Sequence, residues 1–124
     1  MKTASYIDRK SYVRYDNEYY LLYLNESPAE VIVNKNTGLT QSGFSYAGSE
    51  VEGSTKIKAS NVTDDNRRGV FIAGLISLRY DINAQIAMLA NNGDTAEHAA
   101  ELARFNDYRA YCKAAIDELL SRTF

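Results

Sequence analysis

Residues 71–97 read FIAGLISLRYDINAQIAMLANNGDTAE, and this stretch decides the fold of the second half of the chain. Its large apolar side chains recur every three or four residues, which is the spacing of one face of an α-helix. They are Phe71, Leu75, Leu78, Ile82, Ile86 and Leu89. Asp81 interrupts this stripe and can cap a new helical segment, so we expect a kink or break near Tyr80-Asp81.

Capping residues predict where the helices begin and end. Thr63 can cap the first helix, with Asp64 and Asp65 in its first turn, where the helix dipole favours negative charge. Asn91-Asn92-Gly93 ends this helix, and Asp94 or Thr95 starts the next. The connection is short, which predicts antiparallel neighbours.

The next helix carries an apolar stripe of its own, formed by Leu102, Phe105, Tyr108, Cys112, Ile116 and Leu119. Together the two stripes predict the helical part of the core. The residues expected to be buried are Phe71, Leu75, Leu78, Leu102, Phe105, Cys112, Ile116 and Leu119.

Upstream of residue 60 the pattern changes to short runs of strand-forming residues. Strands are expected at 12–15, 19–24, 29–33, 43–47 and 55–59. Asp16-Asn17 and Asn34–Gly38 are turn signals between them. The sequence therefore predicts one α+β domain over 1–124. A small antiparallel β meander within 10–60 is followed by an antiparallel helical pair within 64–121.

Composition and charge argue against several classes of protein. The net charge is -2 and no basic face is evident, which argues against a nucleic-acid partner. No apolar run is long enough for a membrane span, and the first residues lack the apolar core of a signal peptide. A cytoplasmic protein with no membrane partner is expected.

No set of residues has the spacing of a catalytic or metal site. His98, the single histidine, lies beside Glu97 and is expected on the surface, and Cys112 lies on the apolar stripe. Lys113, Asp117, Glu118 and Arg122 are expected to form a solvated, mixed-charge helix face. We therefore expect no enzyme activity, no metal and no cofactor.

Tyrosine is the unusual residue, since the chain has ten tyrosines and no tryptophan. A tyrosine ring is large and apolar with one polar tip, which suits protein interfaces. The candidate interface residues are Tyr12, Tyr15, Tyr19, Tyr20 and Tyr23. The competing interpretation is that these rings only cover the helices from the sheet side.

Several segments between residues 67 and 120 carry a family resemblance. They are Arg67-Arg68-Gly69, Leu78–Asp81, Ala84–Leu89, Asn92–Glu97, Ala100-Glu101 and Tyr108–Tyr111. This region resembles the C-terminal helical region of small proteins encoded in phage and prophage tail gene clusters, including tail-fibre assembly proteins. The resemblance covers under half the chain, and the proline-rich end of many tail-fibre assembly proteins is missing.

The resemblance implies a non-enzymatic phage structural or assembly protein that binds other phage structural proteins. Such a protein is located in the host cytoplasm during assembly or in the virion. With the tyrosine excess, it leads us to expect a homo-oligomer. The alternative is a free-standing cytoplasmic domain unrelated to phage, which binds a protein, or a small ligand in the crevice between sheet and helices.

Overall fold

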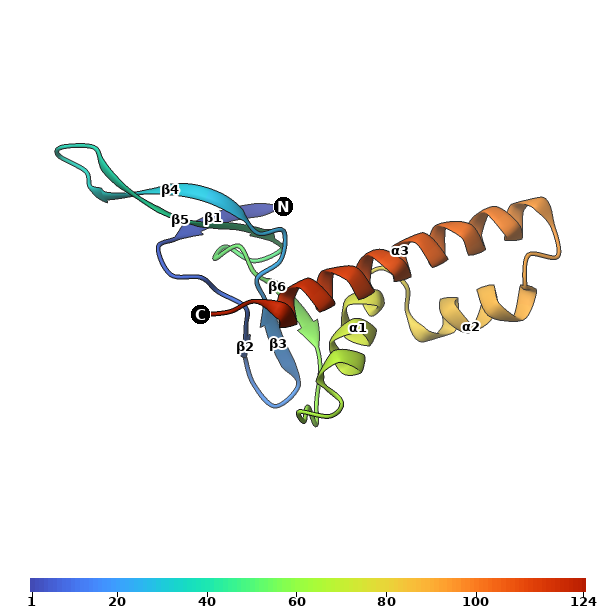
Figure 1. The fold of residues 1–124 in the computed structure, drawn as a ribbon. Helices are drawn as coiled ribbons and strands as arrows, with labels where there is room; N and C mark the ends of the chain where they lie inside the picture. The colour runs from blue at the N-terminus through green and yellow to red at the C-terminus, as the bar shows by residue number, and fades with distance from the viewer.

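The computed structural model describes residues 1–124 and places six strands before three helices (Figure 1). The strands are β1 (Lys2–Tyr6), β2 (Tyr12–Arg14), β3 (Tyr19–Leu22), β4 (Ser27–Asn34), β5 (Leu39–Gly48) and β6 (Thr55–Lys58). The helices are α1 (Arg67–Ser77), α2 (Ile82–Asn91) and α3 (Ala96–Ser121). This order confirms the α+β class. The β-rich part begins earlier than expected, because β1 pairs with the end of β5.

The strands form two antiparallel sheets of three strands each, with the orders β1-β5-β4 and β2-β3-β6, so the prediction of a single meander is wrong. Both expected hairpin turns are present, between β2 and β3 and between β4 and β5. The chain changes sheets after β3, where Asn25 is left-handed with φ of 56°. Pro28 then follows in β4, an edge strand, which is where a sheet tolerates proline.

The core lies between the β2-β3-β6 sheet, α1 and the second half of α3. Leu22, Ile57, Phe71 and Ile116 are all completely buried there. Burial of the predicted core is confirmed for Phe71, Leu75, Phe105, Cys112, Ile116 and Leu119. Leu102 is half-buried. The prediction for Leu78 is wrong: it is 54% exposed, because α1 ends one residue before it and the chain turns away from the core.

Helix α1 begins at Arg67, three residues later than a Thr63 cap would place it. The Thr63 hydroxyl accepts a hydrogen bond from the Asn66 N–H, and the Asn66 side chain accepts one from the Thr63 N–H. This reciprocal pair closes a turn in front of the helix. Asp64 and Asp65 therefore lie outside the first turn of α1.

The other helix boundaries agree with the sequence prediction. Asp81 caps α2 by accepting a hydrogen bond from the backbone N–H three residues later. Asn92 ends α2 in the left-handed region, with φ of 46°. Thr95 caps α3 in the same way as Asp81 caps α2. The break at Tyr80-Asp81 is confirmed, and α3 runs back along α2 and α1 (Figure 1).

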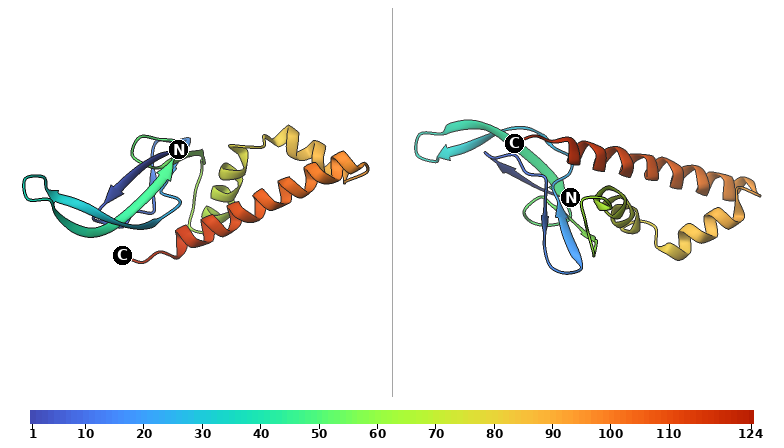
Figure 2. Two further views of the ribbon diagram at one scale, coloured as in Figure 1. Left: turned by 90° about the horizontal axis from the view of Figure 1, so that it is seen from above. Right: turned by 60° about the horizontal axis from the view of Figure 1, so that its bottom comes forward.

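The molecule is elongated, with a projection on each side of the core (Figures 1 and 2). On one side β4 and β5 extend as a two-stranded ribbon. On the other side α2 and the first half of α3 project as a helical arm. The accessible surface is 7850 Å². A compact monomer of this mass exposes about 6,700 Å², so the projections leave roughly 1,200 Å² of additional surface.

Arg122 joins the end of α3 to both sheets, and its side chain is fully buried. Its guanidinium donates to the carbonyl oxygens of Lys10 and Tyr23, at 3.1 and 2.6 Å. It also donates to the Glu118 carboxylate, at 2.6 Å, and lies 3.5 Å from Glu26. The expectation that Arg122 lies on a solvated helix face is therefore wrong.

A second layer of contacts surrounds this arginine. The buried Tyr46 hydroxyl donates to Glu26 and accepts from the Lys10 N–H, both at 2.8 Å. Burial is the main reason that the pKa of Tyr46 is raised to about 12. Burial alone would raise the pKa of Glu26, but hydrogen bonds from Arg9 and Tyr46, with the charge of Arg122, lower it. The network is fully paired, which is what buried charge requires.

Candidate functional site

Three of the five candidate tyrosines belong to intramolecular packing. The rings of Tyr12 and Tyr20 lie 5.2 and 5.1 Å from the ring of Phe71, measured between centroids. Tyr20 shares a strand face with buried Leu22, so strand alternation directs it towards the core. Tyr23 packs on Tyr46 at 5.5 Å. The competing interpretation, in which the rings cover the helices from the sheet side, describes Tyr12 and Tyr20, while Tyr23 packs against tyrosines of the other sheet.

The remaining two tyrosines lie on the outer side of the same sheet. The ammonium nitrogen of Lys56 lies 4.0 Å from the ring centroid of Tyr15 and 4.7 Å from that of Tyr19. Tyr15 is 57% exposed, while Tyr19 is half-buried. The five candidates therefore do not share one outer face. An interface role for Tyr15 and Tyr19 stays a prediction.

A larger exposed apolar surface lies on the helical arm, which we define as α2 together with residues 96–108 of α3. No residue of α2 is buried. Ile82, Ile86 and Leu89 are 65%, 58% and 60% exposed. Single exposed apolar side chains are ordinary, but three at helical spacing on one short helix form a continuous stripe.

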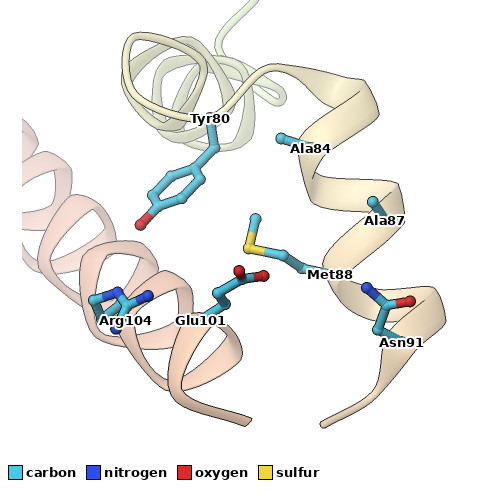
Figure 3. Close-up of a pocket in the computed structure, with 7 residues that line it drawn as sticks. All are labelled: Tyr80, Ala84, Ala87, Met88, Asn91, Glu101 and Arg104. Atoms are coloured by element: carbon cyan, nitrogen blue, oxygen red, sulfur yellow. The ribbon is translucent and has the colours of Figure 1, made fainter. Parts of the chain in front are cut away.

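One side of the arm contains an open pocket of about 300 Å³ between the two helices (Figure 3). From α2 it is lined by Ala84, Ala87, Met88 and Asn91. From α3 it is lined by Glu101, whose carboxylate lies beside Met88, and by Arg104 (Figure 3). Two of the ionisable groups of the arm, Glu101 and Arg104, therefore lie on this side.

The opposite side of the arm carries the exposed apolar stripe of α2, together with the uncharged polar residues Gln85 and Asn106. Helical periodicity places Ile82, Ile86 and Leu89 away from the pocket residues of α2, and it places Ala99 and Ala103 away from those of α3. We call this surface the apolar arm face, and define it as Ile82, Ile86, Leu89, Ala99, Leu102 and Ala103. No residue of α2 is ionisable, and none of these six is.

The sequence predicted this stripe, but it did not separate the part in the core from the part that stays exposed. The spacing of Ile82, Ile86 and Leu89 correctly indicated an amphipathic helix. The missing charge between Ile82 and Asn91 is the signal that could have identified an interface, because a solvated helix face normally carries charged side chains.

Protein-family models, curated proteins and solved structures were all compared with this chain. None of them matches it. Its function is therefore inferred from its own surfaces.

Other features of the fold bear on possible chemistry. No group of three or more His, Cys, Asp or Glu side chains is arranged to hold a metal ion. Cys112 is completely buried, and burial raises the pKa of its thiol. None of the three helices combines the length and the apolar character that crossing a membrane requires.

His98 lies at the tip of the arm and contacts a carboxylate. Its ring nitrogen Nδ1 pairs with Asp94, and its backbone N–H donates to the hydroxyl of Thr95. The hydrogen bond to Asp94 raises the pKa of His98 above its ordinary value of 6.5.

We expect an NMR titration of His98 to give a midpoint above 6.5, and Asp94→Asn to move the midpoint down. Because the pKa is raised in the folded state, this pair stabilises the fold fully below pH 6.5. The contribution is lost as the pH rises through the folded-state pKa. The single histidine makes the signal unambiguous. A midpoint at or below 6.5 would show that the pair does not form in solution.

Proposed function

We propose that this protein is a non-enzymatic structural or assembly protein of phage type that acts through protein–protein contacts in a tail or tail fibre. The observation that carries the proposal is the apolar arm face. It is built from a helix with no buried residue and no charge, held out from the core by α3.

The energetics of this face favour a protein partner. Fully burying an isoleucine or leucine side chain contributes about 1.5–3 kcal/mol, so burying the exposed 60% of each contributes roughly 1–2 kcal/mol. Three such side chains supply roughly 3–6 kcal/mol. Association costs about 4–15 kcal/mol in lost translational and rotational freedom. Because the arm face alone does not offset this cost, the partner has to bury apolar surface of its own. A protein surface does so.

The phage assignment is supported by the resemblance of residues 67–120 to small tail-cluster proteins. That region includes α1, the whole arm and nearly all of α3. The proposal therefore places the protein in the host cytoplasm while tails assemble, or in the virion. Its partners are other phage structural proteins.

A second candidate function is small-ligand binding by a domain unrelated to phage. The observation that favours it is an open pocket of about 470 Å³, lined by residues of both the β-rich part and the helices. Leu24, Leu75, Tyr108 and Tyr111 contribute to its lining. Its volume lies within the usual range for ligand pockets.

Ile86→Glu tests the first proposal. We expect the tagged full-length chain to co-purify with tail or fibre proteins from the producing cell, and Ile86→Glu to reduce this capture at least about tenfold, because it puts a charge into an apolar contact. Ala87→Glu is the matched control, since it adds the same charge on the same helix but on the pocket side.

Quantitative mass spectrometry of the purified complexes measures both variants. Equal capture by the wild type and by Ile86→Glu would remove the arm face as the binding site. Reduced capture by Ala87→Glu alone would instead favour the pocket side of the arm.

A further inference from the structure

We infer that the apolar arm face is occupied by a second copy of this chain, so that two arms stack about a two-fold axis into a four-helix bundle. In this arrangement the α2 stripe of one copy packs on the alanines of α3 of the other copy. The inference rests on the proposed function in one respect, namely that the arm face binds protein.

The shape of the face is complementary to itself. On α2, Ile82, Ile86 and Leu89 form a raised ridge of large side chains. On α3, Ala99 and Ala103 form a flat strip one helical turn apart. A two-fold axis places each ridge on the strip of the other copy. A ridge packed against small residues gives the alternation of large and small side chains found in well-packed bundles.

The electrostatics of the face also fit a second copy. In a two-fold interface the same surface of both copies meets. A charged residue near the axis therefore comes close to the same residue of the other copy, and the two repel. The six residues of the apolar arm face contain no ionisable group. Of the nearby charges of α3, Glu101 and Arg104 line the pocket on the other side, and Asp107 shares an adjoining pocket with Arg104 and Arg79. The face can therefore meet its own copy without repulsion.

The additional surface of the two projections together, the ribbon and the arm, is of the size that a dimer interface uses. A stable interface of standard size buries about 800 Å² on each partner. The chain exposes 7850 Å², roughly 1,200 Å² more than a compact monomer of its mass. Pairing of the arms would bury part of this surplus. It would leave the β4–β5 ribbon of each copy free, because the ribbon projects on the opposite side of the core (Figure 1).

Sedimentation equilibrium of the purified full-length chain tests this inference. We expect a monomer–dimer equilibrium in the wild type and in Ala87→Glu. Ile86→Glu on α2 and Ala103→Glu on α3 should each weaken the dimer at least about 30-fold, since each leaves a charge in the apolar contact. Circular dichroism should show native helix content for every variant, which separates loss of association from loss of folding.

Mixing two variants with opposite charges tests directly whether the α2 ridge of one copy packs on the α3 strip of the other. Ile86→Lys and Ala103→Glu should each be monomeric alone but form a mixed dimer when combined, because one ridge–strip contact then brings opposite charges together. Native mass spectrometry identifies this species. If mixing restores no dimer, the ridge-on-strip pairing is wrong.

A wild-type chain that stays monomeric at the highest concentration it tolerates would overturn the inference. So would a dimer that Ile86→Glu leaves unchanged. Failure of the inference is distinct from failure of the proposed function. The wild-type chain could be monomeric and still lose its capture of tail proteins when Ile86 is replaced by Glu. That result would refute the second copy as occupant of the face but would leave the proposed function standing.

Discussion

Arg122→Ala is expected to lower the free energy of unfolding by about 3–5 kcal/mol, the range for breaking a buried, paired charge. The side chain is completely buried. Its loss leaves the carbonyl oxygens of Lys10 and Tyr23 without their donor, and it removes the pairing of Glu118. Because these partners lie in three separate parts of the chain, the substitution loosens the attachment of α3 to both sheets.

Urea denaturation followed by circular dichroism measures this loss. Arg122→Lys should recover little of it, since an ammonium group lacks the planar fork that reaches two carbonyls and a carboxylate together. Arg109→Ala is the control, because Arg109 is exposed on the same helix and should change stability by less than about 0.5 kcal/mol. Similar small effects at both arginines would show that the Arg122 network does not hold the fold together.

Phe71→Ala is expected to cost about 3–5 kcal/mol, as for truncation of a buried aromatic ring. Phe71 is completely buried, and the rings of Tyr12 and Tyr20 pack against it from the sheet. The alanine leaves a cavity between α1 and the β2-β3-β6 sheet that these tyrosine rings can fill only in part.

Leu78→Ala is the matched comparison, because both residues lie on the stripe that the sequence predicted as core. Leu78 is more than half exposed, so its truncation should cost less than about 1 kcal/mol. Chemical denaturation of both variants measures the two losses of unfolding free energy. Equal losses would contradict the exposure of Leu78 and the turn of the chain after α1.

Features that depend on neighbouring residues were predictable from the sequence. Asp81, Asn92 and Thr95 act within one helical turn of their own position, and all three cap or end helices as expected. The turns after Arg14 and Asn34 are also local, because an Asp or Asn side chain supplies their hydrogen bonds. Capping and turn chemistry require only a few consecutive residues.

Features that depend on distant partners were not predictable. Strand β1 has no clear alternation of its own and is held by its pairing with β5, about forty residues later along the chain. Arg122 has the composition of a surface residue, and its burial depends on acceptors 99 and 112 residues away. The division into two sheets likewise follows from long-range pairing that no local pattern encodes.

The arm combines both cases. Its stripe predicted an amphipathic helix, which is correct, but the residues expected to be buried did not include Ile82, Ile86 and Leu89, and the stripe alone did not show that all three would stay exposed. An apolar helical stripe that stays exposed within its own chain is typical of a surface completed by another chain. This exposed stripe is the basis of the proposed function.

The central claim is that the apolar arm face binds protein, and site-specific photo-cross-linking tests it most directly. A photoreactive side chain at position 86 should give a covalent adduct in the producing cell, and one at position 87 should give none, because Ala87 lines the opposite side of the arm. An adduct of twice the chain mass identifies a second copy, and any other mass identifies a different partner. The absence of an adduct at position 86, or equal adducts at both positions, would contradict the account.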